Sequence, residues 1–171
     1  MPESDFLDGL EGEALFDPDE DVLVPPGKYP AHIKSLSIYP RKTRYASNAD
    51  VYIPMYQIAE EAGENAGVLV RDVGVWRFTA TKNPDTKKIK AGRGNLQYKR
   101  LLEILGMEIP EVKDSYGKVI YRLPKLLESD IAGKPVVIDV FHEEWKGKHG
   151  EMCKAAKARL AHVWSDGKPL E

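Results

Sequence analysis

The side chains best suited to chemistry in this sequence are lysines and arginines that lie close to aromatic residues. The largest group starts at Trp76, Arg77 and Phe78 and continues through a segment rich in basic residues. That segment holds one acidic residue, Asp85, and seven basic ones: Lys82, Lys87, Lys88, Lys90, Arg93, Lys99 and Arg100. Aromatic rings stack on bases and cations follow phosphates, so the pattern predicts a surface that binds single-stranded nucleic acid.

Two smaller groups of basic and aromatic residues lie near positions 41–45 and 145–148, and two tyrosines lie on the strand expected beside Trp76. Together with the large group they define the predicted nucleic-acid-binding residues. These are Arg41, Lys42, Arg44, Tyr45, Tyr52, Tyr56, Trp76, Arg77, Phe78, Lys82, Lys87, Lys88, Lys90, Arg93, Trp145, Lys146 and Lys148.

The period of two in a strand places Trp76 and Phe78 on one face and Arg77 and Thr79 on the other. Trp76 and Phe78 are therefore both exposed or both buried, and burial is the common fate of large aromatic side chains. If they are buried, Arg77 and Thr79 face the groove instead. The ordinary interpretation of any one lysine is a solvated surface charge, so the prediction depends on the clusters.

No motif in the sequence predicts catalysis. The segment 92–94 lacks the spacing and the Lys-Ser/Thr ending of a phosphate-binding loop, and no Gly-x-Ser-x-Gly elbow occurs. His142, His149 and Cys153 fit no strong zinc pattern. We therefore expect a protein that is not an enzyme and needs neither a metal nor a cofactor.

Charge divides the chain of 171 residues into an acidic start and a basic body. Residues 1–21 hold nine of the 27 acidic residues and no lysine or arginine. The remainder has 18 acidic against 25 basic residues, a net charge of +7, which suggests a polyanionic partner. We expect residues 1–21 to be a mostly disordered tail and residues 22–171 to form one domain.

Two further features concern location. No apolar run approaches the roughly 20 residues of a membrane-spanning helix, and the acidic start lacks the basic and apolar regions of a signal peptide. The single cysteine, Cys153, excludes an internal disulfide. A cytoplasmic protein is therefore predicted.

Alternation of apolar and polar residues predicts five principal strands, at residues 28–38, 51–59, 68–80, 136–141 and 151–164. Pro54 indicates an edge or a bulge in the second strand. The Ala and Lys content of 151–164 also favours a helix, but its alternation and its place after a hairpin loop at 145–150 favour the strand.

Helical and turn elements lie between these strands. A helix is expected from Asn95 to Leu105, with an apolar stripe of Leu96, Leu101, Leu102 and Leu105 and a stop at Gly106. A hairpin around Tyr116-Gly117, a helical turn at 124–129 and a closing turn at 165–167 complete the pattern.

Three strands, a helix, an inserted hairpin and two further strands form the sequence order of an oligonucleotide-binding (OB) barrel. The fold class predicted is mainly β: a five-stranded, OB-fold-like Greek-key barrel with one or two helices. In such barrels the second and third strands form the binding face, and the first and last hairpin loops flank it. The basic and aromatic clusters fall at these positions, which favours nucleic-acid binding.

The chain resembles a family of phage-encoded single-stranded DNA-binding proteins over residues 24–164. The resemblance rests on Pro26, Gly27 and Tyr29, on the third strand leading into the helix from Leu96 to Gly106, and on the Ala-Gly-Lys-Pro-Val segment at 132–136. It implies a barrel that coats single-stranded DNA in phage replication or recombination, in the host cytoplasm. Members commonly carry an acidic partner-recruiting tail at the C-terminus, whereas this chain has its acidic segment first.

Three alternatives remain at the level of sequence. RNA in place of DNA is one, because stacking platforms tolerate either sugar. A protein-interaction or assembly module is another, with the basic face docking the acidic tail of a second protomer or of another protein. The third concerns the acidic tail, which recruits replication or recombination proteins, folds back over the basic groove, or serves only to keep the protein in solution.

Overall fold

The computed structural model describes residues 9–14, 23–41, 49–82, 85–87, 89–90, 94–165 and 168–169. The expected acidic tail lies outside the described residues except for a turn within 9–14. Most of the expected closing turn, residues 166–167, also lies outside them. Among the described residues, no helix has the length and apolar character needed to cross a membrane.

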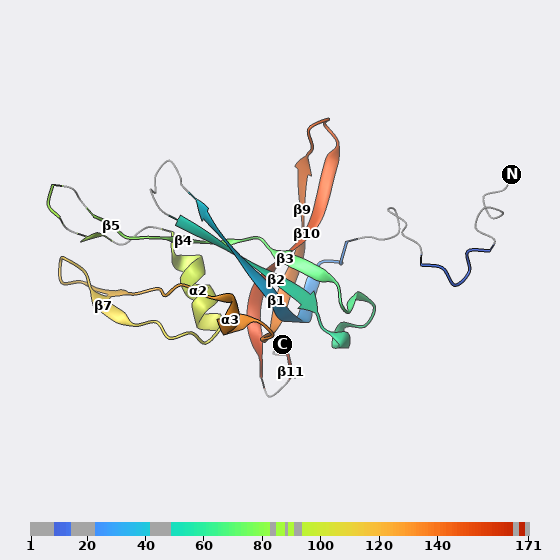
Figure 1. The fold of residues 1–171 in the computed structure, drawn as a ribbon, viewed down its shortest axis with the longest axis horizontal. Coiled ribbons are helices and arrows are strands. Elements are labelled where there is room, and N and C mark those ends of the chain that lie inside the picture. The colour runs from blue at the N-terminus through green and yellow to red at the C-terminus, as the bar shows by residue number, and fades with distance from the viewer. Residues whose placement is uncertain are drawn as a thin grey trace.

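Five strands form the body of the protein: β1 (Gly27–Arg41), β2 (Ala49–Ile58), β3 (Leu69–Asp72), β9 (Pro135–Lys146) and β10 (Met152–Ser165). β1 pairs antiparallel with β2 and β9, β2 with β3, and β9 with β10. A parallel pairing between β3 and β10 completes the ring. The result is a closed five-stranded barrel of the OB type (Figure 1), and the predicted fold class is confirmed.

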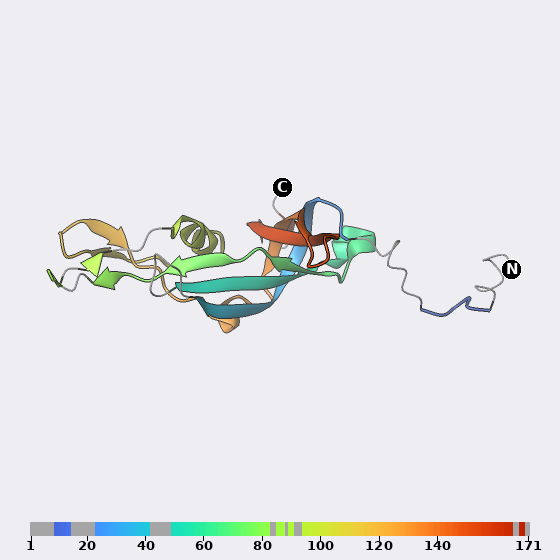
Figure 2. The same ribbon diagram turned by 90° about the horizontal axis from the view of Figure 1, so that it is seen from above.

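Four further strand pairings extend from this barrel. β4 (Val75–Phe78) pairs with the first half of β2, and β11 (Lys168–Pro169) pairs with the end of β10. Two small hairpins are formed by β5 (Thr81–Lys82) with β6 (Ile89–Lys90) and by β7 (Glu111–Lys113) with β8 (Val119–Tyr121). Figures 1 and 2 show both hairpins at the same end of the molecule, away from the N-terminus.

The core combines the inward faces of the strands with one face of the helix α2 (Leu96–Ile104). The helix begins and ends within a residue of its predicted bounds. Leu101, Leu102 and Leu105 are buried as the stripe predicts, but Leu96 is exposed and Tyr98 is fully buried. Positions 98, 101, 102 and 105 follow the spacing of one helical face, whereas Leu96 lies off that face.

The other short helices join the strands. A 3-10 helix, η1 (Glu60–Asn65), connects β2 to β3, and α3 (Glu128–Ile131) precedes β9. The helical turn expected at 124–129 therefore begins later than predicted. The hairpin around Tyr116-Gly117 and the final strand, β10, are confirmed. β9 continues to Lys146, so Trp145 and Lys146 lie in a strand and not in the expected hairpin loop.

The expected third strand at 68–80 is divided into β3 and β4 by Val73 and Gly74. Gly74 has a φ of +97°, and a Cβ added there would lie 3.2 Å from Val51 Cγ1. This break lets β3 pair with β10 and lets β4 follow β2 away from the barrel.

Pro54 does not lie on an edge strand, because β2 is paired on both sides. It falls in the interval between the two partners on one side of β2: β3 pairs with residues 55–57 and β4 with residues 49–52. The missing N–H of proline is tolerated where a ladder is interrupted. The irregularity predicted for this region occurs in β1, where the register shifts between Ile33 and Ser35.

Asp72 is a buried charged residue at the end of β3, with 2% of its surface exposed. The Tyr56 hydroxyl donates a hydrogen bond to Asp72 Oδ2 (2.6 Å), and the Gly74 N–H donates one to Oδ1 (2.9 Å). Burial raises the pKa of Asp72, and these two hydrogen bonds oppose that rise. The carboxylate thus fixes the turn from β3 to β4 against the core.

The substitution Tyr56→Phe tests this role of Asp72. Removing the hydroxyl should lower the free energy of unfolding by about 1–3 kcal/mol, because the buried carboxylate loses a donor. The loss should increase as pH rises through the folded-state pKa of Asp72, because the unfolded-state pKa is the same in both proteins and cancels from the difference. The hydroxyl stabilises the ionised form, so its removal raises the folded-state pKa further.

Urea unfolding at acidic and neutral pH measures both effects. Tyr29→Phe is a matched control, because the Tyr29 hydroxyl donates to the Pro25 carbonyl, which does not titrate. Its effect should be small and independent of pH. An equal loss for Tyr56→Phe at both pH values would contradict the assignment.

Candidate nucleic-acid interface

Strand register decides which side chains share the outer surface of the barrel. Residues directly opposite each other in neighbouring strands point to the same face. Three rows of this kind are Tyr39–Val51–Trp76, Arg41–Ala49–Phe78 and Met55–Arg71–Lys157–Phe141. The alternate residues, such as Tyr52, Tyr56 and Ala158, are fully buried inside the barrel. The three rows therefore face outward, although Ala49 and Val51 within them are buried.

We call this surface the outer face. It runs from the far end of the β1–β2 pair, over β4 and β3, to β10 and the β9–β10 hairpin. Its aromatic and basic members are Tyr39, Arg41, Arg71, Trp76, Phe78, Phe141, Trp145, Lys157 and Arg159.

Aromatic rings occupy the end of the outer face formed by β1 and β4. Tyr39 and Trp76 are 41% and 36% exposed. The rings of Trp76 and Phe78 stack, with centroids 5.7 Å apart and planes 17° from parallel. The prediction that Trp76 and Phe78 share one face is confirmed. Trp76 is exposed and Phe78 is half-buried. These rings form a platform of the kind on which bases stack.

Cations lie beside the aromatic rings at both ends of the outer face. The Arg41 guanidinium carbon is 5.4 Å from the centroid of the Tyr39 ring, and that of Arg159 is 5.5 Å from the centroid of Phe141. Arg71 and Lys157 are neighbours between these ends. The ion pairs found among the described residues involve none of these four cations. The charge of Arg159 acts on the buried carboxylate of Asp72. The other three cations have no ion pair among the described residues, so their charge remains available to an anionic partner.

The β9–β10 hairpin carries the predicted cluster of Trp145, Lys146 and Lys148. Trp145 lies opposite Cys153, four residues along from the Lys157–Phe141 pair, so it belongs to the outer face and is 46% exposed. Lys146 precedes the turn on the opposite face of the hairpin, and Lys148 is exposed within the turn. The register thus separates the two lysines from the tryptophan.

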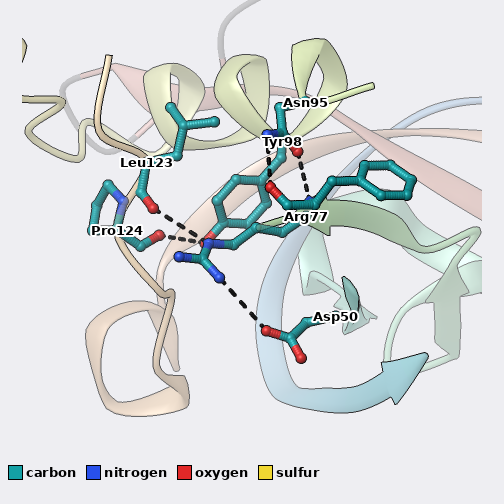
Figure 3. A network of polar contacts seen from close by, with 7 residues as sticks. Asp50, Arg77, Asn95, Tyr98, Leu123 and Pro124 are labelled. Carbon is teal, nitrogen blue, oxygen red and sulfur yellow. Dashed lines mark hydrogen bonds and ion pairs between the residues drawn. The ribbon is translucent and has the colours of Figure 1, made fainter. Parts of the chain in front are cut away.

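Asn95 and Gly94 hold the Phe78 end of the platform in place (Figure 3). The Phe78 N–H donates to Asn95 Oδ1 (2.7 Å), and Asn95 Nδ2 donates to the Phe78 carbonyl (3.0 Å). The side-chain amide of Asn95 thus takes the place of a neighbouring strand along β4. Gly94 has a φ of +91°, and a Cβ there would lie 2.8 Å from Phe78 Cε2. The ring of Phe78 therefore packs directly against the backbone before α2.

Arg77 does not contribute to the outer face, which corrects its predicted role. Its side chain is 17% exposed and points toward Asp50 (Figure 3). The register places it on the opposite face of β4 from Trp76. Its Nε donates to the Leu123 carbonyl (3.3 Å), and a terminal nitrogen lies 3.6 Å from Asp50 Oδ2. The neighbouring Tyr98 hydroxyl donates to the Pro124 carbonyl (2.6 Å). Arg77 and Tyr98 together anchor the segment after β8 to the barrel.

Tyr52 and Tyr56 are fully buried, so the prediction that either ring stacks on bases is wrong. Tyr52 packs against Tyr98 with ring centroids 4.9 Å apart, and Tyr56 donates to Asp72. Both rings lie on the inward side of β2, and of the two buried hydroxyls only that of Tyr56 has a hydrogen-bond partner among the described residues.

The basic segment after β4 is a hairpin arm and not an open loop. Lys82 lies opposite Ile89, and Lys90 lies opposite Thr81. Lys87 is exposed in the turn and has a positive φ of 60°. Five other predicted residues lie outside the described residues: Lys42, Arg44, Tyr45, Lys88 and Arg93.

Several outer-face residues were not among those predicted from the sequence. Tyr39 borders the predicted cluster at 41–45, whereas Arg71, Phe141, Lys157 and Arg159 lie in strands without a dense cluster of basic and aromatic residues around them. They meet only because β3, β9 and β10 are neighbours in the closed barrel. Alternation of apolar and polar residues could have assigned each side chain to one face of its strand. It does not show which strands are adjacent.

A scan of protein-family models found no match to this chain, and a search of curated proteins found none either. The resemblance to phage single-stranded DNA-binding proteins therefore stays a prediction.

Gly94→Ala tests the support of the aromatic platform. The added methyl group should displace the Phe78 ring and disturb its stacking with Trp76, in addition to the backbone cost of a positive φ. We expect a loss of more than about 1 kcal/mol in the free energy of unfolding and a change in tryptophan fluorescence of the folded state.

Gly117→Ala is the control, because Gly117 has a φ of +79° and open space around its Cβ position. It carries the backbone cost without the collision. Equal stability and unchanged fluorescence in the two variants would contradict the packing of Phe78 on Gly94.

Proposed function

We propose that this protein binds single-stranded DNA without sequence preference and has no catalytic role. The observation that supports this most directly is the composition of the outer face. Exposed aromatic rings lie at both of its ends, and cations without carboxylate partners among the described residues lie between them. This combination matches the requirements of a stacking platform with an electrostatic track.

In this proposal, Tyr39, Trp76 and Trp145 stack on bases, and Arg41, Arg71 and Lys157 neutralise phosphates. Stacking contributes about 1–3 kcal/mol per base and tolerates every base, because each base has a π-face. The proposed role in the cell is to coat single strands exposed in replication or recombination, as the resemblance implies. Location in the cytoplasm and recruitment of other proteins by the acidic N-terminal segment belong to the same proposal.

A protein-interaction module is the second candidate, and one observation favours it. The β7–β8 hairpin exposes four large apolar or aromatic side chains: Val112, Tyr116, Val119 and Tyr121. Such a concentration on a hairpin outside the barrel is typical of a protein contact. This function requires no nucleic acid and would use a different surface from the outer face.

Fluorescence anisotropy with a labelled poly-dT of about 30 nucleotides tests the proposed function. Binding should weaken steeply with salt, with a slope of about −0.7 in log K against log salt for each phosphate contacted. It should also greatly exceed binding to a duplex of the same length. Absence of binding at low salt would exclude the proposal and leave the interaction module.

Lys157→Gln tests the electrostatic track in this assay. The salt slope should become shallower by about 0.7, because one phosphate contact is lost. Lys154→Gln is the control, because Lys154 lies in the same strand but on the opposite face. Its Nζ is 3.8 Å from Glu144 Oε1. An equal change in both variants would show that the face of the strand does not matter.

Trp145→Ala tests stacking at the hairpin. Affinity for poly-dT should fall by about 1–3 kcal/mol, with little change in the salt slope. Met152→Ala is the control, because Met152 is also exposed but lies on the other face of the hairpin. It should bind as the wild type does. An unchanged affinity of the Trp145→Ala variant would show that the β9–β10 hairpin is not part of the DNA-binding interface.

A further inference from the structure

A crevice opens where β4 and β10 diverge and α2 fills the wedge between them. Its volume is about 350 Å³. Val75 from β4, Leu101 and Ile104 from α2 and Leu160 from β10 give it apolar walls. The volume is at the low end of the roughly 300–1,000 Å³ typical of small-molecule sites. A space of this size accommodates a group on the scale of one nucleotide.

Three polar side chains line the same crevice: Gln97 and Arg100 from α2, and Arg159 from β10. Neither arginine takes part in the ion pairs found among the described residues. Asp72 is the acidic residue of the lining, and both of its oxygens accept hydrogen bonds from Tyr56 and Gly74. The charge of Arg159 also acts on Asp72, so this carboxylate offsets part of the positive charge of the two guanidinium groups. The positive charge that remains favours an anionic group in the crevice.

The crevice is continuous with the outer face through Arg159 and Gly74. Arg159 lines the crevice and also lies over the ring of Phe141. Gly74 also lines the crevice. A Cβ at Gly74 would contact Val51 and Ile53 of β2, which lie next to the aromatic platform. A strand crossing the outer face between Trp76 and Lys157 therefore passes the mouth of the crevice.

We propose that the crevice holds one nucleotide of the bound single strand. Its phosphate lies between Arg100 and Arg159, its base packs against the apolar walls, and the Gln97 amide bonds to the base edge. This inference rests on the proposed function and adds to it a defined subsite. Bases stack on the exposed aromatic rings of the outer face. The crevice instead encloses one nucleotide whose base is not stacked on its neighbours.

Amide NMR spectra of the full chain, titrated with thymidine monophosphate, test the subsite. The signals of residues 97, 100 and 159 should shift more than those of the rest of the chain. Thymidine alone and inorganic phosphate alone are the comparison probes, and each should shift these signals less than the nucleotide does. Equal shifts with either component, or none in the crevice, would overturn the proposal.

The double substitution Arg100→Gln with Arg159→Gln should abolish the shifts at residue 97. Lys99→Gln is the matched control, because Lys99 neighbours Arg100 on α2 but pairs with Glu103 and lies over the Tyr121 ring. It should leave the shifts at residue 97 unchanged. Persistence of the shifts in the double variant would overturn the assignment of the two arginines.

Poly-dT binding separates failure of this inference from failure of the proposed function. The double variant should bind poly-dT with a shallower salt slope and at least tenfold more weakly at low salt. Wild-type binding with an unaffected double variant would overturn the subsite and leave the function standing. No poly-dT binding by the wild type would overturn the function and, with it, the crevice as a subsite for a strand.

Discussion

The barrel closes through a short parallel contact between β3 and β10, and the rest of the structure depends on it. The contact joins Arg71 to Lys157 and Asp72 to Ala158, and the Val73 N–H continues it by donating to the Ala158 carbonyl. Asp72 is held at this point by Tyr56 and Gly74. A buried carboxylate destabilises the folded state unless its hydrogen bonds are satisfied. The groups that donate to Asp72 therefore also fix where β3 pairs with β10.

The contact between β3 and β10 also brings the parts of the outer face together. Because β3 lies beside β10, Arg71 and Lys157 become neighbours, and the aromatic platform on β4 is joined to the β9–β10 hairpin by one continuous surface. The break at Gly74 sends β4 away from β10 while it stays paired with β2. α2 fills the wedge that results, and the crevice with its two arginines lies at that point. One interruption in a strand thus forms both the aromatic platform and the crevice.

Residues of the same chemical types occur in the candidate interface and in the scaffold. Arg77 lies between two platform aromatics in sequence, yet it contacts Asp50 and the Leu123 carbonyl on the inward side of β4. Tyr52 and Tyr98 pack together in the core, whereas Tyr39 is exposed on the outer face. In this protein the face of the strand, more than the density of basic and aromatic residues, separates the candidate interface from the scaffold.

The sequence by itself determined the order of the elements and the fold class. Alternation predicted β1, β2, β9 and β10, and helical spacing predicted α2, because these patterns arise from local geometry and burial. It also placed Trp76, Phe78 and Trp145 among the candidates. Only the tertiary structure decided that Tyr52 and Tyr56 are buried and that Arg71, Lys157 and Arg159 join the site. Alternation gives two faces to each strand, but which face is inside and which strands are neighbours follow from closure of the barrel, a contact between residues more than 80 positions apart.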